Sequence, residues 1–354
     1  MGFISHAIKI ILQLFKRQGE NYIMGIQLTP LAKGRRIEIS ELSGRIIAVD
    51  ALNWIYQFLS IIRQRDGQPL MDSSGNITSH LSGIFYRSLN LMEAGVKLVY
   101  VFDGKPPKLK EKTAELRREA RKEAAEKWQA ARERGDDEEA KKYAMRSSVI
   151  TNQMLEESRL LLDAMGIPWI IAPSEGEALC SVMVAKGDAY AAATQDYDAF
   201  LFGCSRVVRN LSISNNKRNI FPEMLTVKDL TESLGITREQ LILLGILVGT
   251  DYNPGGINGI GPKKALALVK KHPTLNEILP NIQWPFEVPM QEIFDFFYTP
   301  IEAAYEIKFK PLDTENVKEI LCNRHEFSIE RIESGLARIQ ETKAAGQKSL
   351  NKWF

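Results

Sequence analysis

Four short apolar runs stand out along the first 200 residues, and each stops at an acid or at a turn. RIIAVD over 45–50 and VKLVYVFD over 96–103 both end in aspartate. WIIA over 169–172 stops at a turn, and AYAAATQD over 189–196 ends in aspartate again. Runs of this length and composition are typical of buried strands. We therefore expect four strands that end close to polar or acidic residues.

Helical spacing of apolar residues fills the gaps between these runs. It covers Asn53–Arg63, Leu81–Ala94 and Thr151–Met165. Buried strands that alternate with helices predict an α/β fold with a mostly parallel central sheet flanked by helices. Ligands of such sheets bind beyond the carboxyl ends of the strands. The acids that end the runs would lie at that edge.

A highly charged stretch over 105–150 interrupts this alternation. Its first part, 105–122, contains eight basic residues against three acids, and Gly135-Asp136-Asp137 makes a turn. We expect two polar helices, joined near residue 135 and inserted between elements of the core. Composition alone favours a solvated helical hairpin, whereas the position directly after an acid-tipped strand favours a functional role.

Seven carboxylates fall in loops or helix starts where the strands end. Glu175 and Glu177 form an E-x-E at a predicted helix start, for which Ser174 is the expected N-cap. D-x-D at Asp196 and Asp198 is expected to place both side chains on one side of an extended segment. The full set is Asp50, Asp103, Glu175, Glu177, Asp196, Asp198 and Asp251.

This many acids at one sheet edge would repel each other unless cations neutralise them. Oxygen ligands with no histidine or cysteine nearby point to Mg²⁺, with Mn²⁺ as a substitute. Two such ions about 4 Å apart suit the hydrolysis of phosphodiesters. Any single one of these acids is more commonly a turn former or a helix cap, so the prediction rests on the whole set.

A glycine-rich segment follows the last of these acids. GTDY over 249–252 and GGINGIGPKK over 255–264 predict helix, hairpin and helix across 240–275. Gly259 and Gly261 would present backbone N–H groups to a phosphate, and Lys263 and Lys264 would add positive charge. Such contacts grip a duplex without reading its sequence. The alternative is an ordinary Gly-Pro turn.

Composition adds limits on the class of protein. With 44% apolar residues, 25% charged residues and a net charge of +2, the chain is an ordinary globular protein. Any nucleic-acid site must therefore come from how charge is distributed. No apolar run is long enough to span a bilayer, so we expect no membrane partner. The three cysteines predict reduced thiols and an intracellular protein, cytoplasmic in a prokaryote or nuclear in a eukaryote: Cys180, Cys204 and Cys322.

Six motifs together resemble the flap endonucleases of the archaeal and eukaryotic type. They are VDALNWIYQFL (49–59), YVFDGKPPKLK (100–110), PSEGEALC (173–180), TQDYDAFLFG (194–203), GTDY (249–252) and GIGPKKAL (259–266). The likeness runs in order from Met24 to the last residue. It implies one nuclease domain over 24–340, preceded by a dispensable amphipathic extension over 1–23.

The resemblance also implies roles for individual residues. The seven acids would be the ligands of two metal ions. Lys110 and Arg117, seven residues apart on one helical face, would lie at the base of a helical arch and neutralise the scissile phosphate. Tyr56 would stack on an unpaired base, and Arg63 would contact a phosphate nearby. The alternatives for these two are a core aromatic and a surface cation.

Two further parts of the chain complete what the resemblance implies. Thr78 would belong to a pocket for a single 3′ nucleotide. The polar tail over 341–354 would be flexible and would bind a sliding clamp. Its apolar side chains would form a plug of one helical turn. The residues of this clamp-binding box are Gln347, Leu350, Trp353 and Phe354.

The expected function is that of a monomeric, structure-specific 5′ flap endonuclease with 5′ exonuclease activity. It would act on branched DNA, namely 5′ flaps and nicked or gapped duplexes, in Okazaki fragment maturation and base excision repair. One alternative is a non-catalytic scaffold that binds branched DNA and the clamp. Another is a bubble- or gap-cutting nuclease of the same superfamily. Two departures from the family pattern are the extension and a hairpin one residue longer before Gly259.

Overall fold

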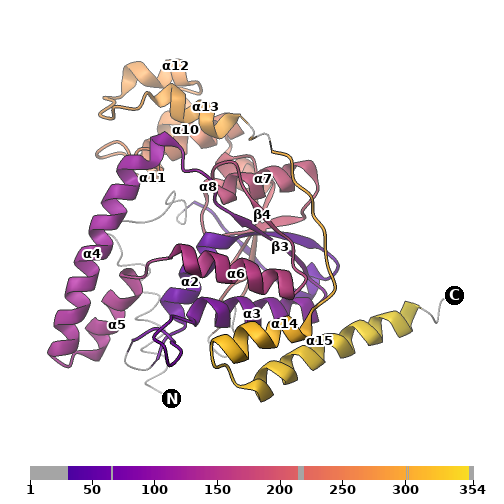
Figure 1. The fold of residues 1–354 in the computed structure, drawn as a ribbon. Coiled ribbons are helices and arrows are strands. Elements are labelled where there is room, and N and C mark those ends of the chain that lie inside the picture. Colours follow the sequence, from indigo (N-terminus) through magenta and orange to yellow (C-terminus); the bar gives the residue numbers. More distant parts are fainter. Residues whose placement is uncertain (1–30, 65–66, 214–218, 300, 302, 351–354) are drawn as a thin grey trace.

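The computed structural model of the chain describes residues 31–64, 67–213, 219–299, 301 and 303–350 (Figure 1). The extension over 1–23 lies outside the described residues, and so do Trp353 and Phe354 of the expected clamp-binding box.

A seven-stranded sheet forms the centre of the molecule. Its strands lie in the order β1 (Arg35–Arg36), β7 (Glu223–Thr226), β6 (Arg206–Arg209), β5 (Ala191–Ala193), β2 (Ile46–Asp50), β3 (Lys97–Phe102) and β4 (Trp169–Ile171). All pairs from β6 to β4 are parallel, whereas β7 runs antiparallel to β6 and to β1. The predicted α/β fold with a mostly parallel sheet is therefore confirmed, and its four predicted strands are β2 to β5.

Alternate residues of the strands feed two separate cores, one on each face of the sheet. Leu98, Tyr100 and Phe102 of β3 pack among residues of α2 (Ala51–Ile61), α3 (Ser79–Glu93) and α6 (Asn152–Ala164). Val99 and Val101 face the other side. The helices there are α7 (Gly176–Lys186), α8 (Asp198–Leu201) and α10 (Arg238–Val248).

The charged insertion forms a helical hairpin that stands beside the sheet (Figure 1). A short 3-10 turn, η2 (Lys108–Lys110), leads into α4 (Glu111–Glu133), and α5 (Asp137–Arg146) runs back beside α4. Gly135 joins them with φ +72°, and Asp136 caps α5 by accepting the Glu139 N–H at 2.9 Å. The two polar helices meet where the sequence predicts. We call α4 and α5 the helical arch.

The glycine-rich segment joins α10 to α11 (Pro262–Lys271), as predicted. After α11 come the short α12 (Leu275–Ile278) with η4 (Leu279–Asn281), and then α13 (Met290–Tyr298). Helix α9 (Val227–Leu234) precedes α10 in the chain. Helices α10 to α13 sit above the carboxyl edge of the sheet in Figure 1.

An extended segment returns the chain to the opposite end of the molecule. It leads into α14 (Thr314–Lys318), the π-helical turn η5 (Glu319–Arg324) and α15 (Ile329–Leu350). Helix α15 includes Gln347 and Leu350, so the described part of the tail is helical where the sequence analysis expected a flexible segment. Among the described residues, no helix is both long and apolar enough to cross a membrane.

Candidate active site

Two acids lie at the carboxyl ends of neighbouring parallel strands. Asp50 ends β2 and caps α2, because its Oδ1 accepts the Asn53 N–H at 3.1 Å. Asp103 follows β3, and its Oδ1 accepts the Gly176 N–H at 2.8 Å. The parallel register of β2 and β3 brings the two strand ends together. The edge of the sheet therefore positions the first pair of predicted ligands.

The E-x-E contributes two more carboxylates from the start of α7. Glu175 occupies the N-cap position itself, without a capping bond from its side chain. The expected N-cap at Ser174 is therefore wrong, and its buried hydroxyl has no hydrogen-bond partner among the described residues. Glu177 lies in the first helical turn, where its Oε1 accepts the Thr194 hydroxyl at 3.2 Å.

The D-x-D follows β5, but its backbone is not extended. Tyr197 has helical dihedral angles, and Asp198 begins α8. The expectation of an extended D-x-D is therefore wrong, because the chain turns into a helix directly after Asp196. The Asn53 amide nevertheless donates to Asp196 Oδ2 at 3.1 Å, so the D-x-D remains tied to α2.

The last acid meets the base of the helical arch. Lys110 Nζ lies 3.0 Å from Asp251 Oδ2 and also forms an ion pair with Glu175. Arg117 pairs with Asp251 as well, and the Thr113 hydroxyl donates to the Asp251 carbonyl. The arch therefore delivers two cations directly onto the acids.

The charges of the acids influence one another across the whole cluster. Burial, followed by the charge of Asp103, raises the pKa of Asp50 well above its ordinary value. Burial and the nearby Asp196 and Asp198 do the same to the pKa of Glu177. Burial also raises the pKa of Asp103. Each of the seven predicted acids thus interacts electrostatically with at least one other acid of the cluster.

The arch cations neutralise one side of this cluster better than the other. Burial and the charge of Asp251 raise the pKa of Asp196 to about 6. At Asp251 the effect of burial is overcome by Lys110 and Arg117, which hold its pKa below the ordinary value. Despite burial, Glu175 and Asp251 raise the pKa of Lys110. For the acids farther from the arch, the positive charge nearby does not offset burial and mutual repulsion, so their pKa values stay raised.

The chemistry of these donors fits hard divalent cations. The cluster offers oxygen ligands from buried carboxylates, and three of the seven residues are less than 9% exposed: Asp50, Glu175 and Asp198. Within the described parts of the chain, no three such side chains already converge at ligand distances. Lys110 and Arg117 hold Glu175 and Asp251 instead, so the side chains would have to rearrange around an ion.

Two family models match the chain over the segments that carry this cluster. The XPG N-terminal domain matches residues 24–124, and the XPG I-region matches residues 166–251. Flap endonuclease 1 of Thermococcus onnurineus is 51% identical over 341 residues, which are 94% of this chain and 99% of that protein. Flap endonuclease 1 of Pyrococcus abyssi is also 51% identical, over 94% of this chain and 98% of its own length.

The chain belongs to the flap endonuclease 1 family.

The solved structures agree with this membership. Flap endonuclease-1 from Methanococcus jannaschii is 39% identical, covers 91% of this chain and 100% of its own, and superposes with a TM-score of 0.74. The catalytic core of Rad2 in complex with DNA substrate shares the fold, with 23% identity, 89% and 100% coverage and a TM-score of 0.68. The family match begins at residue 24, where the resemblance also begins.

Three residues of this flap endonuclease support the acids but escaped the sequence analysis. Asn53 donates its backbone N–H to Asp50 and its side-chain amide to Asp196. Gln57 in turn donates to Oδ1 of Asn53 at 2.7 Å. The Tyr252 hydroxyl donates to Glu175 Oε2 at 2.5 Å. The third residue is Thr113 of the arch. Asn53 and Tyr252 lie close to predicted acids in VDALN and GTDY. This proximity in the sequence could have indicated that they support the acids.

The predicted DNA-binding residues of α2 and of its connection to α3 have different surroundings. Tyr56 is half-buried, with the Arg121 guanidinium 5.8 Å above its ring. Arg63 is engaged within the protein, because it donates to the Gly67 and Ala144 carbonyls at 2.8 and 2.7 Å. Thr78 is only 4% exposed at the start of α3. Tyr56 is therefore the best placed of the three to meet a base.

The hairpin of this flap endonuclease exposes its backbone to solvent. Gly261 is the N-cap of α11 and Pro262 occupies its first turn, so the free N–H groups there point outward. A Cβ at Gly261 would meet nothing within 4 Å. Gly259 turns the chain with φ +75°, and Lys264 donates to its carbonyl at 2.9 Å. Lys263 is exposed beside them.

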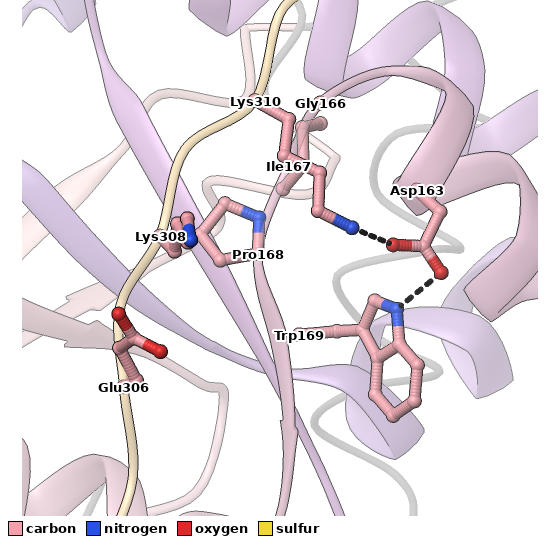
Figure 2. Close-up of a pocket in the computed structure, with 8 residues that line it drawn as sticks. All are labelled: Asp163, Gly166, Ile167, Pro168, Trp169, Glu306, Lys308 and Lys310. Atoms are coloured by element: carbon pink, nitrogen blue, oxygen red, sulfur yellow. Dashed lines mark hydrogen bonds and ion pairs between the residues drawn. The ribbon is translucent and has the colours of Figure 1, made fainter.

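A cavity of about 210 Å³ lies away from the acids, where β4 begins (Figure 2). In it, Trp169 and Lys310 donate to the two oxygens of Asp163 at 3.1 and 3.0 Å. Both oxygens of this carboxylate therefore have partners within the protein. Because the cavity opens at the amino end of the strand, it takes no part in the site at the carboxyl edge.

Proposed function

We propose that this flap endonuclease hydrolyses phosphodiester bonds of branched DNA with two Mg²⁺ ions held by its seven acids. Mn²⁺ would substitute for Mg²⁺, because both prefer carboxylate oxygens. The observation that carries the proposal is the excess of buried carboxylates at one sheet edge, where pKa values are raised by burial and mutual repulsion. The ions would activate water and stabilise the leaving oxygen.

Lys110 and Arg117 would neutralise the scissile phosphate. Both are already held in the cluster by the acids, and both come from the base of the arch. A phosphate that enters with its cations would compete for these two side chains. Charge contacts made mainly in the transition state speed the chemical step more than they strengthen binding.

The remaining family features would position the DNA. Gly259, Gly261, Lys263 and Lys264 would grip the duplex backbone, and this grip would be independent of sequence. Tyr56 would stack on an unpaired base, while Arg63 and Thr78 would act close to the DNA from the segment between α2 and α3. The substrates would be 5′ flaps and nicked or gapped duplexes. The relevant processes are Okazaki fragment maturation and base excision repair, and the protein would act as a monomer.

One assay tests this function. A labelled double-flap duplex is incubated with and without Mg²⁺, and with a free or a blocked 5′ end. We expect Mg²⁺-dependent cleavage close to the branch, together with slower trimming of recessed 5′ ends. Binding without cleavage under every metal condition would instead identify a non-catalytic scaffold. Preference for bubbles over flaps would identify the related bubble-cutting activity.

The tail would bind a sliding clamp through Gln347, Leu350, Trp353 and Phe354. Apolar side chains on one helical turn can fill a surface pocket, and their aromatic members carry most of the affinity. Trp353→Ala combined with Phe354→Ala should abolish stimulation by the cognate clamp and leave clamp-free cleavage intact. Undiminished stimulation of that double variant would remove the clamp-binding role.

A further inference from the structure

The described residues of the segment between α2 and α3, 62–64 and 67–78, form two small hairpins. We call this segment the connector. Bridges pair Arg63 with Pro69 and Met71 with Ile77. The two hairpins meet at Ser79, whose hydroxyl accepts the Leu70 N–H at 2.9 Å and donates to the Ile62 carbonyl at 2.6 Å. Ser79 is fully buried, so it ties both hairpins to the start of α3.

The first hairpin is fastened to the helical arch. Arg63 Nη2 donates to the Ala144 carbonyl at 2.7 Å and to the Ser148 hydroxyl at 2.6 Å, at the end of α5. The Gly67 backbone lies against α5 as well, since a Cβ there would be 3.3 Å from Lys141 Cα. A guanidinium that bonds two different groups in a fixed geometry makes a rigid anchor.

The second hairpin is fastened to the C-terminal part of the chain, just before α15. His325 Nδ1 lies 3.0 Å from Asp72 Oδ2. Glu326 accepts the Ser73 N–H at 2.8 Å and also the Ser73 hydroxyl. We call these four residues the C-terminal latch. Its two contacts each join residues that are more than 250 positions apart in the sequence.

The latch requires an unfavourable backbone angle at Glu326, and further polar contacts hold Asp72 and His325 in place. Glu326 has φ +58°, a left-handed conformation that residues other than glycine rarely adopt. Asp72 is held from its own hairpin, because Asn76 donates to Oδ1 at 2.8 Å and to Oδ2 at 3.0 Å. His325 Nε2 faces Glu157 of α6 at 3.6 Å. The latch therefore has a defined geometry on both of its sides.

We propose that His325 and Glu326 are positioning residues for the helical arch and act on it through the connector. The connector joins the latch to the arch by continuous polar contacts, and in Figure 1 it lies between α5 and the start of α15. The arch carries Lys110 and Arg117 to the acids. An arch that loses its outer support would present these cations less often in the correct place. The effect on cleavage rests on the proposed function.

The variants separate the contact from the fold. His325→Ala removes the donor to Asp72, whereas His325→Asn keeps a nitrogen close to the position of Nδ1. Glu326→Gly removes the carboxylate at a position where the positive φ suits glycine, so the fold should tolerate it. Arg324→Ala is the matched control, because Arg324 pairs within its own segment with Glu319 at 3.4 Å and is exposed.

Amide hydrogen exchange of the DNA-free protein tests the link without reference to activity. His325→Ala and Glu326→Gly should speed exchange in the connector and also at residues 141–148 of the arch. His325→Asn should restore most of the protection, and Arg324→Ala should change neither region. If exchange rises in the connector alone, the latch is local and the proposal is wrong.

Single-turnover cleavage of a saturating flap gives the functional readout. We expect His325→Ala and Glu326→Gly to slow cleavage about threefold to tenfold, the range usual for coupling through packed networks, with little change in Kd for the flap. Combining His325→Ala with Arg63→Ala should cost less than the sum of the two, since both break one link. Wild-type rates in the latch variants would overturn the proposal, whereas an inactive wild type would overturn the proposed function instead.

Discussion

Two clusters of carboxylates, one at the carboxyl edge of the sheet and one at the latch, balance their charge in different ways. The active-site cluster gathers seven acids around two cations, Lys110 and Arg117. The second cluster lies at the latch and, besides Glu326, contains two acids, Asp72 and Glu157, with two histidines. Its His80 Nε2 lies 3.4 Å from Glu157 Oε2, and His325 faces both acids.

The pKa values report this difference directly. In the active site, burial and repulsion raise the pKa of Asp196 to about 6. In the second cluster, bonds from Asn76 and His325 lower the pKa of Asp72 to about 2. The pKa of Glu157 is also lowered, because bonds from His80 and Gln153 outweigh its burial. Carboxylates that receive hydrogen bonds from the protein stabilise the fold. Carboxylates that lack enough positive charge around them are available to bind cations from solution.

The largest effect is expected when one acid of the active-site cluster is removed. Asp103→Ala should lower single-turnover flap cleavage by at least about a thousandfold, because a lost ligand displaces a cation from the reaction. Flap binding should remain measurable, since it rests on the hairpin and the basic arch. Quench-flow cleavage and a binding titration of the same variant check both statements. Near-normal cleavage would take Asp103 out of the site.

Removing an arch cation should have the next largest effect. Lys110→Ala and Arg117→Ala should each slow the chemical step by a factor that corresponds to about 2–4 kcal/mol, the usual loss for one preorganised charge contact. The Kd for flap DNA should change much less. If a substitution weakens binding and leaves the saturated rate intact, that residue tethers DNA and has no role in the chemical step.

Stability should depend on pH with opposite signs in the two clusters. Because the folded-state pKa of Asp196 is raised, its contribution is full below about pH 4 and is lost as the pH rises through about 6. In metal-free protein, Asp196→Asn should therefore stabilise the fold at pH 7.5, on the order of 3 kcal/mol, and by only about a third as much at pH 4.5. Denaturant unfolding at the two pH values measures this difference.

Asp72→Asn is the matched substitution in the second cluster. The folded-state pKa of Asp72 is lowered, so its contribution is present above about pH 4 and is lost as the pH falls toward 2. Asp72→Asn should therefore destabilise the protein at pH 7.5. The same sign of change for both variants at neutral pH would break the contrast between the clusters.

The smallest effect concerns the lysines of the glycine-rich hairpin, which lie outside both clusters. Lys263→Ala combined with Lys264→Ala should weaken binding to every duplex sequence alike. The slope of log K against log salt should become shallower by about two units. Salt titrations on two unrelated duplex sequences measure this change, and a defect on one sequence alone would indicate base readout.

The sequence predicted that the acids gather at one edge of the sheet, because the signal that each acid carries is local. Every acid except Asp251 follows a strand or lies at the start of a helix, so the periodicity of the fold was enough to bring distant motifs such as Asp50 and Asp103 to one edge. The geometry within a motif was less predictable: Ser174 does not cap α7, and Asp196 and Asp198 do not share an extended segment. These details depend on where a helix begins, which is the least certain part of any pattern.

The latch was not predictable in the same way. Asp72 and His325 carry no motif and lie 253 positions apart, so only the tertiary fold brings them together. Arg63 shows a related limit. The resemblance suggested a phosphate contact for it, but no pattern indicated that its guanidinium bonds the Ala144 carbonyl and the Ser148 hydroxyl of the protein. Tertiary contacts of single polar side chains leave no periodic trace in the sequence.

The central claim is that the active-site cluster is an excess of negative charge built to receive cations. Its most direct test is the shift in Tm that Mn²⁺ causes in DNA-free protein, because a ligand that binds the folded state raises its stability. We predict the same rise for wild type and for Asp72→Asn, and a much smaller one for Asp196→Asn. An equal rise in Asp196→Asn, or none in wild type at millimolar Mn²⁺, would contradict the claim.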